Sequence, residues 1–270
     1  MKKLTFNNIT KQEFAIISRL SYDRKYNGEK IINVAQIKAY LPKNYKYPLQ
    51  FIYRLKQKKI LRPLKRGLYT FNPIETMPVG MKLPDLAVAD VYMEGKEYYV
   101  GYLSLFNWYG FSEQLFQDVY VINTGRSFEK YIDNIRFNFI KVKKEFMYGI
   151  IEKQIAGGKV RITDKERTMI DLLYWNKAVG GINPAIKTVE EIIKEKKCDI
   201  QKFIDYAVKY PRPTIRKIIG VILDKAGISE TLTNPLYETI KDTSLTSAKW
   251  NKRTGTKNNK WKVIINDTSE

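Results

Sequence analysis

Hydrophobic and polar positions follow a helical period between Pro48 and Lys59. Phe51, Ile52 and Leu55 fall on one face of such a helix, with Pro48 and the stem of Lys59 on the same face. The opposite face carries hydrogen-bonding side chains, namely Lys46, Gln50, Tyr53, Arg54 and Gln57. The pattern therefore predicts an amphipathic helix of about four turns, with one face in a core and the other in solvent.

The period changes to two directly after this helix. Residues 60–64 and 68–71 form two short, largely apolar runs, separated by Lys65, Arg66 and Gly67. A glycine at this position supplies the backbone freedom that a tight hairpin turn needs. We therefore predict a basic β-hairpin immediately after the amphipathic helix.

Two further helices are predicted before this segment. Thr10 and Glu13 have the spacing of a capping box, which starts the first helix at Lys11. Its predicted buried residues are Phe14, Ile16, Ile17 and Leu20. Asn33 is a suitable N-cap for a second helix over residues 34–41, which Pro42 ends. The resulting order of helix, short strand, helix, turn, helix and hairpin is typical of a winged helix-turn-helix.

A larger region follows a connection over residues 72–84 that contains three prolines. We therefore predict a winged helix-turn-helix domain at residues 1–74 and a second domain at residues 75–270. Apolar runs in the second domain predict helices at 86–92, 184–197, 200–210 and 213–226, and strands at 118–122, 135–142, 147–154, 159–162 and 261–265. A second capping box, Thr163 to Glu166, opens a helix whose Ile170, Leu173 and Tyr174 pack inward, and the aromatic-rich stretch 100–108 belongs to the core. The predicted fold class is α+β, a winged helix-turn-helix followed by a larger domain of mixed helix and sheet.

Positive charge is concentrated in the first of these regions. The chain has 270 residues, 44% of them hydrophobic, and a formal net charge of +20. Residues 1–72 contain 17 Lys and Arg against three acids, a net charge of +14, so the remainder contributes only +6. Since neutralising phosphates releases counterions, a polyanion is the natural partner of such a segment.

The composition also removes several kinds of chemistry. Histidine is absent and Cys198 is the only cysteine, so His-dependent nucleophilic sites and zinc sites are excluded. The glycine pairs lack the context of a phosphate-binding loop. We therefore expect no enzyme activity, no cofactor and no metal. A single cysteine, no apolar run of roughly 18 residues and no signal peptide predict a cytoplasmic protein that does not enter a membrane.

The polar helix face has the chemistry to lie in the major groove of double-stranded DNA, where Arg and Gln can pair bidentately with bases. The residues expected to face the bases are Lys46, Tyr47, Gln50, Tyr53, Arg54 and Gln57. Arg62, Lys65 and Arg66 of the hairpin are expected to reach the phosphate backbone or the minor groove. An exposed basic loop at residues 249–260 is expected to add affinity without setting specificity, through Lys249, Lys252, Arg253, Lys257 and Lys260. The alternative is that both segments are ordinary solvated surfaces.

Three segments resemble the antitoxin component of the AbiE abortive-infection systems, AbiEi. They are KQKKILRPLKRGLYTF, VRITDKERTMIDLL and NKWKVIIN, in this order and at these separations. The resemblance covers nearly the whole chain. It implies a winged helix-turn-helix that represses its own operon by binding inverted repeats in double-stranded DNA. It further implies neutralisation of a nucleotidyltransferase-like toxin, in the type IV manner without a stable complex.

Two other functions fit parts of the sequence. Pro84-Asp85 followed by Glu94-Gly95-Lys96 matches the PD-(D/E)xK nuclease signature, which would hold Mg²⁺ between its carboxylates. That chemistry needs the second group on a strand, whereas the intervening residues are predicted to be helical. A free-standing winged-helix transcription factor would share the DNA chemistry and lack a toxin partner.

Overall fold

The computed structural model describes residues 9–27, 31–71, 85–93, 95–114, 116–132, 135–155, 158–248 and 255–265. Two compact units divide the chain. Unit 1 consists of Met1–Glu94 and Gln154–Lys159, and unit 2 of Gly95–Lys153 and Val160–Glu270. The boundary expected at residue 74 falls within residues 72–84, outside the described residues. Helices and strands are mixed along the chain, so the predicted α+β class is confirmed.

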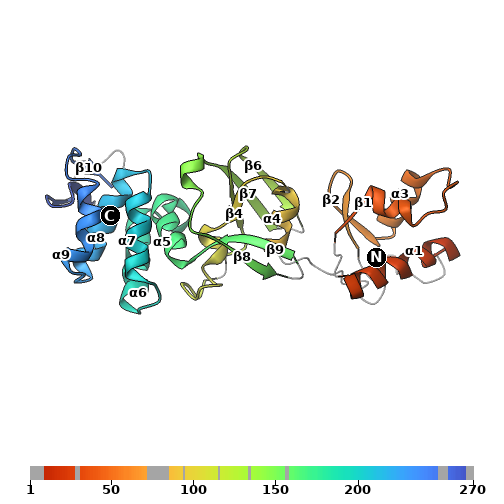
Figure 1. Ribbon diagram of the computed structural model, residues 1–270, viewed down its shortest axis with the longest axis horizontal. Helices are drawn as coiled ribbons and strands as arrows, with labels where there is room; N and C mark the ends of the chain where they lie inside the picture. The colour runs from red at the N-terminus through yellow and green to blue at the C-terminus, as the bar shows by residue number, and fades with distance from the viewer. Residues whose placement is uncertain are drawn as a thin grey trace. The chain divides into compact units, whose positions relative to one another are not determined.

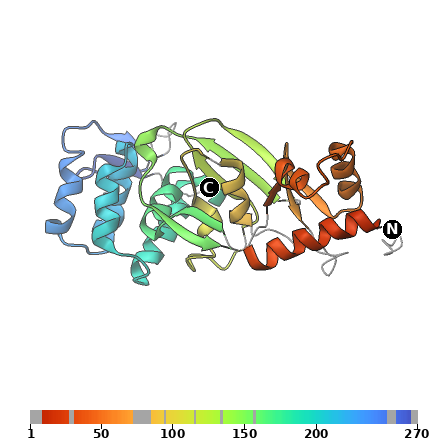
Figure 2. The same ribbon diagram turned by 45° about the vertical axis from the view of Figure 1, so that its right-hand side comes forward.

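Unit 1 begins with three helices and a small sheet. Its elements are α1 (Lys11–Asn27), β1 (Ile31–Asn33), α2 (Val34–Ala39), α3 (Pro48–Gln57), β2 (Leu61–Lys65), β3 (Leu68–Phe71) and α4 (Asp85–Met93). The strands pair antiparallel in the order β1-β3-β2. In both views α1 lies below α3 and the β2–β3 hairpin (Figures 1 and 2). This order of elements is the predicted one.

Side chains fix the starts of α1 and α2, as predicted. The backbone N–H of Glu13 donates to the Thr10 hydroxyl at 3.2 Å, and the Thr10 N–H donates to the Glu13 carboxylate at 2.9 Å. Asn33 forms the equivalent reciprocal pair with Gln36 at the start of α2. Each exchange satisfies backbone N–H groups that the first turn of a helix leaves without a partner.

The core of unit 1 forms where these helices meet the sheet, and its members include Ile17, Leu20, Ile37, Phe51, Leu55 and Phe71. Two predicted core positions are wrong. Phe14 is 55% exposed, since Glu13, Ile16, Ile17 and Leu20 occupy the inner face of α1. Lys59 is also exposed, because its φ of 58° turns the chain out of α3, which spans ten residues and is shorter than predicted.

Unit 2 contains most of a six-stranded sheet, of which residues 154–155 and 158–159 belong to unit 1. Its strands are β4 (Tyr98–Val100), β5 (Val119–Asn123), β6 (Phe128–Ile132), β7 (Ile135–Lys141), β8 (Ile150–Ile155) and β9 (Gly158–Thr163), in the order β6-β7-β5-β4-β9-β8. β5 pairs parallel with β7 and antiparallel with β4. The predicted aromatic stretch is divided between β4 and the 3₁₀ helix η3 (Tyr102–Leu105), and its aromatic side chains are buried except at its end.

Helices α5 to α9 gather beside this sheet (Figure 1). They are α5 (Lys165–Tyr174), α6 (Ile182–Lys194), α7 (Ile200–Lys209), α8 (Pro213–Lys225) and α9 (Glu230–Glu238), with the 3₁₀ turns η4 (Lys144–Phe146) and η5 (Asn176–Val179). A small sheet of β10 (Thr246–Ser247), β12 (Val263–Ile265) and β11 (Thr256–Asn258) follows. No helix in the described residues is both long enough and apolar enough to cross a membrane.

Two local predictions for unit 2 need correction. The N-cap of α5 is Asp164, whose side chain accepts from the Arg167 N–H, and not Thr163. The last strand starts at Val263 and not at Trp261, because Lys262 between them has a φ of 50° and breaks the extended backbone. Tyr174 at the end of α5 packs against the core as predicted, although it is only half-buried.

Trp261 packs directly on α8. A Cβ added to Gly220 would lie 2.1 Å from its indole ring, so the helix must present bare backbone there. The indole N–H donates to the Asp224 carboxylate at 2.7 Å. The segment that leads into β12 is thereby fixed to the helical core.

Candidate nucleic-acid interface

The two faces of α3 differ as the sequence pattern predicts. Phe51 and Leu55 have no exposed surface, whereas Tyr53, on the opposite side, is 58% exposed. The predicted base-facing residues are all exposed: Lys46, Tyr47, Gln50, Tyr53, Arg54 and Gln57. Gln50, Tyr53, Arg54 and Gln57 lie on α3, whereas Lys46 and Tyr47 precede its first residue. Hydrogen-bonding side chains in a row on a helix can pair with groups on a surface opposite it.

Glu13 ties the end of α3 to α1. Its buried carboxylate accepts a hydrogen bond from the Lys58 ammonium at 2.5 Å and lies 3.6 Å from the guanidinium of Arg54. Burial acts to raise the pKa of Glu13, but the hydrogen bonds from Lys58 and from the Thr10 backbone outweigh it, so this pKa lies below its ordinary value. The ionised carboxylate therefore fixes where the exposed face of α3 points.

Arg54 has two roles in this arrangement. Besides its ion pair with Glu13, it donates to the Tyr45 hydroxyl at 3.1 Å, and its side chain remains 48% exposed. An arginine held on both sides in this way is oriented before any ligand arrives, which lowers the entropy cost of binding.

The β2–β3 hairpin extends the same basic segment. Gly67 turns the chain with a φ of 79°, and its carbonyl accepts a hydrogen bond from the Val34 N–H at 3.1 Å. Arg66 at the turn is exposed, and Arg62 and Lys65 on β2 are half-buried. The register of the hairpin shifts between Pro63 and Lys65, which increases the local twist. All three predicted cations of the hairpin thus reach the surface of unit 1.

The sequence pattern gives no signal for one exposed residue of α3. Leu49 is 65% exposed, one turn before Tyr53 on the same side of the helix. In the sequence Leu49 lies beside Pro48 and close to Phe51 and Ile52, so it looks like another buried residue. An exposed apolar side chain on a helix that lies in a major groove can contact the methyl group of thymine.

The second predicted basic segment is only partly described. Lys249, Lys252 and Arg253 lie outside the described residues, and Lys257 is exposed on β11. Lys260 does not fit the expectation of a solvated cation. Its ammonium pairs with Asp224 at 3.1 Å and Glu230 at 3.0 Å, so it holds the loop against α8 and α9.

The nuclease signature cannot be assembled from the described side chains. Residues 85–93 are helical as predicted, whereas Pro84, Glu94 and the side chain of Asp85 lie outside the described part. In the residues that the structure describes, no group of three or more His, Cys, Asp and Glu could hold a metal ion. Burial and the nearby acids Glu166 and Asp199 raise the pKa of Cys198 to about 11, which disfavours the nucleophilic thiolate.

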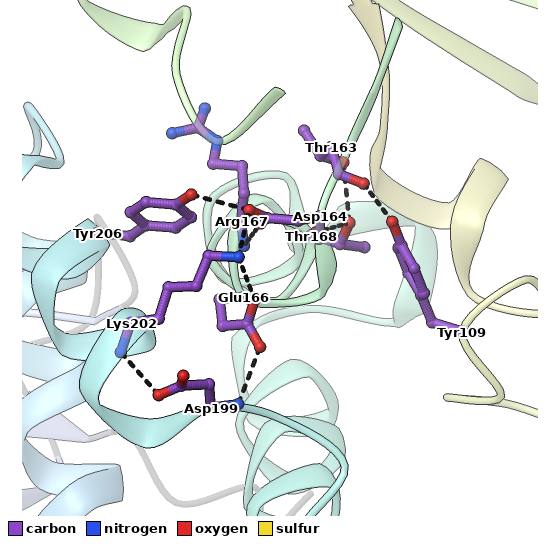
Figure 3. Close-up of polar contacts among 9 residues, drawn as sticks. All are labelled: Tyr109, Thr163, Asp164, Glu166, Arg167, Thr168, Asp199, Lys202 and Tyr206. Carbon is purple, nitrogen blue, oxygen red and sulfur yellow. Dashed lines mark hydrogen bonds and ion pairs between the residues drawn. The ribbon is translucent and has the colours of Figure 1, made fainter. Parts of the chain in front are cut away.

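A polar cluster joins α5 to α7 in unit 2 (Figure 3). The Lys202 ammonium lies 2.9 Å from Asp164 and 3.4 Å from Glu166, and the Tyr206 hydroxyl donates to Asp164 at 2.8 Å. Glu166 also accepts from the Asp199 N–H at 2.9 Å. Because the carboxylates of Asp164 and Glu166 are satisfied within the chain, the cluster acts as a structural connection between the two helices.

Arg167 follows Glu166 on α5, and its side chain has no exposed surface. Its guanidinium pairs with Asp171 at 2.9 Å and donates to the Tyr99 hydroxyl at 3.0 Å. It also lies over the rings of Tyr148 and Tyr210, at 4.4 and 5.1 Å from their centroids. A buried cation requires such compensation from a counter-ion and ring faces.

Comparison with known proteins shows the fold alone. Neither a known protein family nor a curated protein matches the chain. Among solved structures, the chain is similar to the crystal structure of the RV2827C protein from Mycobacterium tuberculosis, with a TM-score of 0.61 and 9% sequence identity. The similarity covers 95% of this chain and 92% of that one, so the two share a fold over nearly their whole length.

Proposed function

We propose that this chain is a sequence-specific repressor that binds double-stranded DNA through α3 and the β2–β3 hairpin, and that it is the antitoxin of an AbiE-type system. The observation that carries the DNA-binding proposal is the exposed polar face of α3, whose opposite face lies in the core. A helix of this width fits the major groove of B-DNA.

The arrangement of unit 1 supports this proposal in two further ways. Its element order is typical of a winged helix-turn-helix, in which we expect the last helix of the motif to contact bases and the hairpin to contact the backbone. The net charge of +14 over residues 1–72 favours a polyanionic partner.

The antitoxin role rests on the family resemblance. In such a system the protein acts in the cytoplasm, represses its own operon through inverted repeats and counteracts a nucleotidyltransferase-like toxin without a stable complex. Unit 2, with a large core of its own and a weak net charge, is the part that we assign to this task.

Gel-shift titration on the chain's own promoter tests DNA binding. If six or more phosphates are engaged, affinity should fall by roughly a thousandfold or more between 50 and 200 mM salt. A scrambled duplex of the same length is the control. Equal binding to both duplexes, or binding that does not respond to salt, would contradict the proposal.

Growth rescue tests the antitoxin role separately. The full chain is co-expressed with the neighbouring nucleotidyltransferase, beside a Gln50→Ala, Arg66→Ala variant that is expected to lose repression. Rescue by both proteins is the expected result. If neither protein rescues growth while the full chain still binds its promoter, a free-standing transcription factor is favoured. Cleavage of DNA in the presence of Mg²⁺ would favour the nuclease.

A further inference from the structure

A pocket of about 600 Å³ opens on unit 2. Four cations line it: Lys141 at the end of β7, Lys143 and Lys144 at the start of η4, and Arg212 just before α8. No acidic side chain is among the described residues that line it. The cations come from segments far apart in the sequence, so the fold brings them to one place.

These cations are poorly neutralised by the protein. Lys144 lies 3.9 Å from Glu97, but the two side chains are 84% and 48% exposed, so this pair contributes little. Lys141, Lys143 and Arg212 form no ion pair with any described residue. Four like charges around one opening repel each other, and an anion that enters it relieves the repulsion.

Aromatic side chains form the other part of the lining. Tyr174 lies between Phe146 and Trp175, with ring centroids at 5.7 and 5.1 Å. The guanidinium of Arg212 lies 5.8 Å from the Tyr174 centroid and 5.9 Å from that of Phe146, which limits its freedom. Tyr174 and Trp175 are half-buried, so part of each ring is accessible. The pocket thus presents flat aromatic surface directly beside positive charge.

We propose that this pocket binds a nucleotide unit, with its base on Trp175 and its phosphates held by Lys141, Lys143 and Arg212. A small inorganic anion would leave the aromatic surface unused, and an uncharged aromatic compound would leave the cations unneutralised. The volume is within the range of about 300–1,000 Å³ found for small-molecule sites. Stacking on aromatic rings together with phosphate contacts is the usual way in which proteins hold bases that are not paired. The unit is either a free nucleotide or the end of a single strand.

Isothermal titration calorimetry of the full chain with ATP tests the proposal. Binding is expected, and the Lys141→Ala, Lys143→Ala variant should weaken it by at least about tenfold, equivalent to about 1.4 kcal/mol. Lys187→Ala removes an exposed lysine from α6, outside the pocket, and should leave binding unchanged. Quenching of tryptophan fluorescence by ATP should persist in Trp108→Phe and be lost or strongly reduced in Trp175→Phe.

Three further ligands define the outcome. Inorganic triphosphate and adenosine should each bind much more weakly than ATP, and equal binding of either one would overturn the nucleotide proposal. A five-nucleotide single strand that binds while ATP does not would identify the strand end as the source of the unit. The absence of binding by both up to millimolar concentration would overturn the proposal, as would equal loss in Lys187→Ala. Promoter binding by unit 1 is measured in a separate experiment, and its outcome does not affect whether the pocket binds a nucleotide.

Discussion

The ammonium group of Lys58 donates a 2.5 Å hydrogen bond to the carboxylate of Glu13, which lies 45 residues earlier in the chain. Glu13 thereby caps α1 through Thr10 and holds the end of α3 with the same carboxylate. The direction of the exposed face of α3 thus depends on one buried acid. This relationship leads to two predictions about unit 1.

Glu13→Gln should destabilise unit 1 by about 1–3 kcal/mol, because it removes the charge that Lys58 and Arg54 share. Hydrogen exchange of the peptides that cover residues 9–71 measures this loss. Glu129→Gln, which changes an exposed glutamate on β6 in unit 2, should leave those peptides unchanged. Equal exchange in both variants would show that the carboxylate does not hold α3.

The same residue predicts a dependence on pH. Since the folded pKa of Glu13 lies below its ordinary value, its contribution to stability is present above about pH 4.3 and is lost as the pH falls through the folded pKa. The difference in melting temperature between the wild type and Glu13→Gln should therefore be largest near neutral pH and shrink in acid. A difference in melting temperature that grows in acid would contradict a lowered folded pKa of Glu13.

The face of α3 and the hairpin should differ in what they contribute to DNA recognition. Gln50→Ala should relax discrimination at one base position by about 1–3 kcal/mol, whereas Lys65→Ala should weaken all sequences alike. Gel shifts on a set of single-substitution operators measure both effects. Gln50 is a cleaner test than Arg54, because Arg54→Ala also removes a partner of Glu13. A change of sequence preference in Lys65→Ala alone would mean that the assignment of the two surfaces is wrong.

The basic loop at residues 249–260 should add to the affinity for DNA without changing the sequence preference. Replacing Lys252, Arg253 and Lys257 with Ala should reduce the slope of log affinity against log salt by up to about 0.9 for each phosphate that is no longer neutralised. The relative affinities for different operators should stay the same. Lys260 is kept in this variant because it pairs with Asp224 and Glu230. An unchanged slope would identify the segment as ordinary solvated surface.

Gly220→Ala should destabilise unit 2, the opposite of the usual effect of this substitution within a helix. The new methyl group would meet the Trp261 ring at 2.1 Å, and overpacking of this kind costs about 1–3 kcal/mol. Urea unfolding measures the change. Combined with Trp261→Leu, the alanine should cost less than it does alone, and strict additivity of the two substitutions would argue against this packing.

Asp171→Ala should cost about 3–5 kcal/mol, because it leaves the Arg167 guanidinium buried without a counter-ion. The double variant Arg167→Met, Asp171→Leu removes both charges and should recover most of that loss. Tryptophan fluorescence during urea unfolding follows each variant. If the double variant is less stable than the single one, packing around Arg167 matters more than its charge.

Local patterns predict α3 and its hairpin well, because the period of 3.6, the change to two and Gly67 all lie within one short stretch. Edge strand β6 gives a weaker signal, since its middle residues are exposed and mostly polar. Helix α9 is missed because Pro235 within it indicates a break. For β6 and α9, tertiary packing outweighs the local preference of the sequence.

Interactions between distant segments are the part that the sequence does not reveal. The capping role of Glu13 can be predicted from Thr10, but its bond to Lys58 cannot. The lysines near η4 form a charged run in the sequence, but nothing in the sequence indicates that they line the same pocket as Arg212. Lys260 reads as one more exposed cation until Asp224 and Glu230 are placed beside it.

The position of Trp261 bears on the order in which the protein can form during synthesis. The core of unit 1 draws on residues between Ile9 and Phe71, so it can close while most of the chain is still untranslated. Helices α5 to α8 lack the indole that fills the space over Gly220 until residue 261 has left the ribosome. At about 5–20 residues per second, the N-terminal core therefore precedes the completed helical core by roughly ten seconds or more. The exposed face of α3 is therefore complete before the second core is finished.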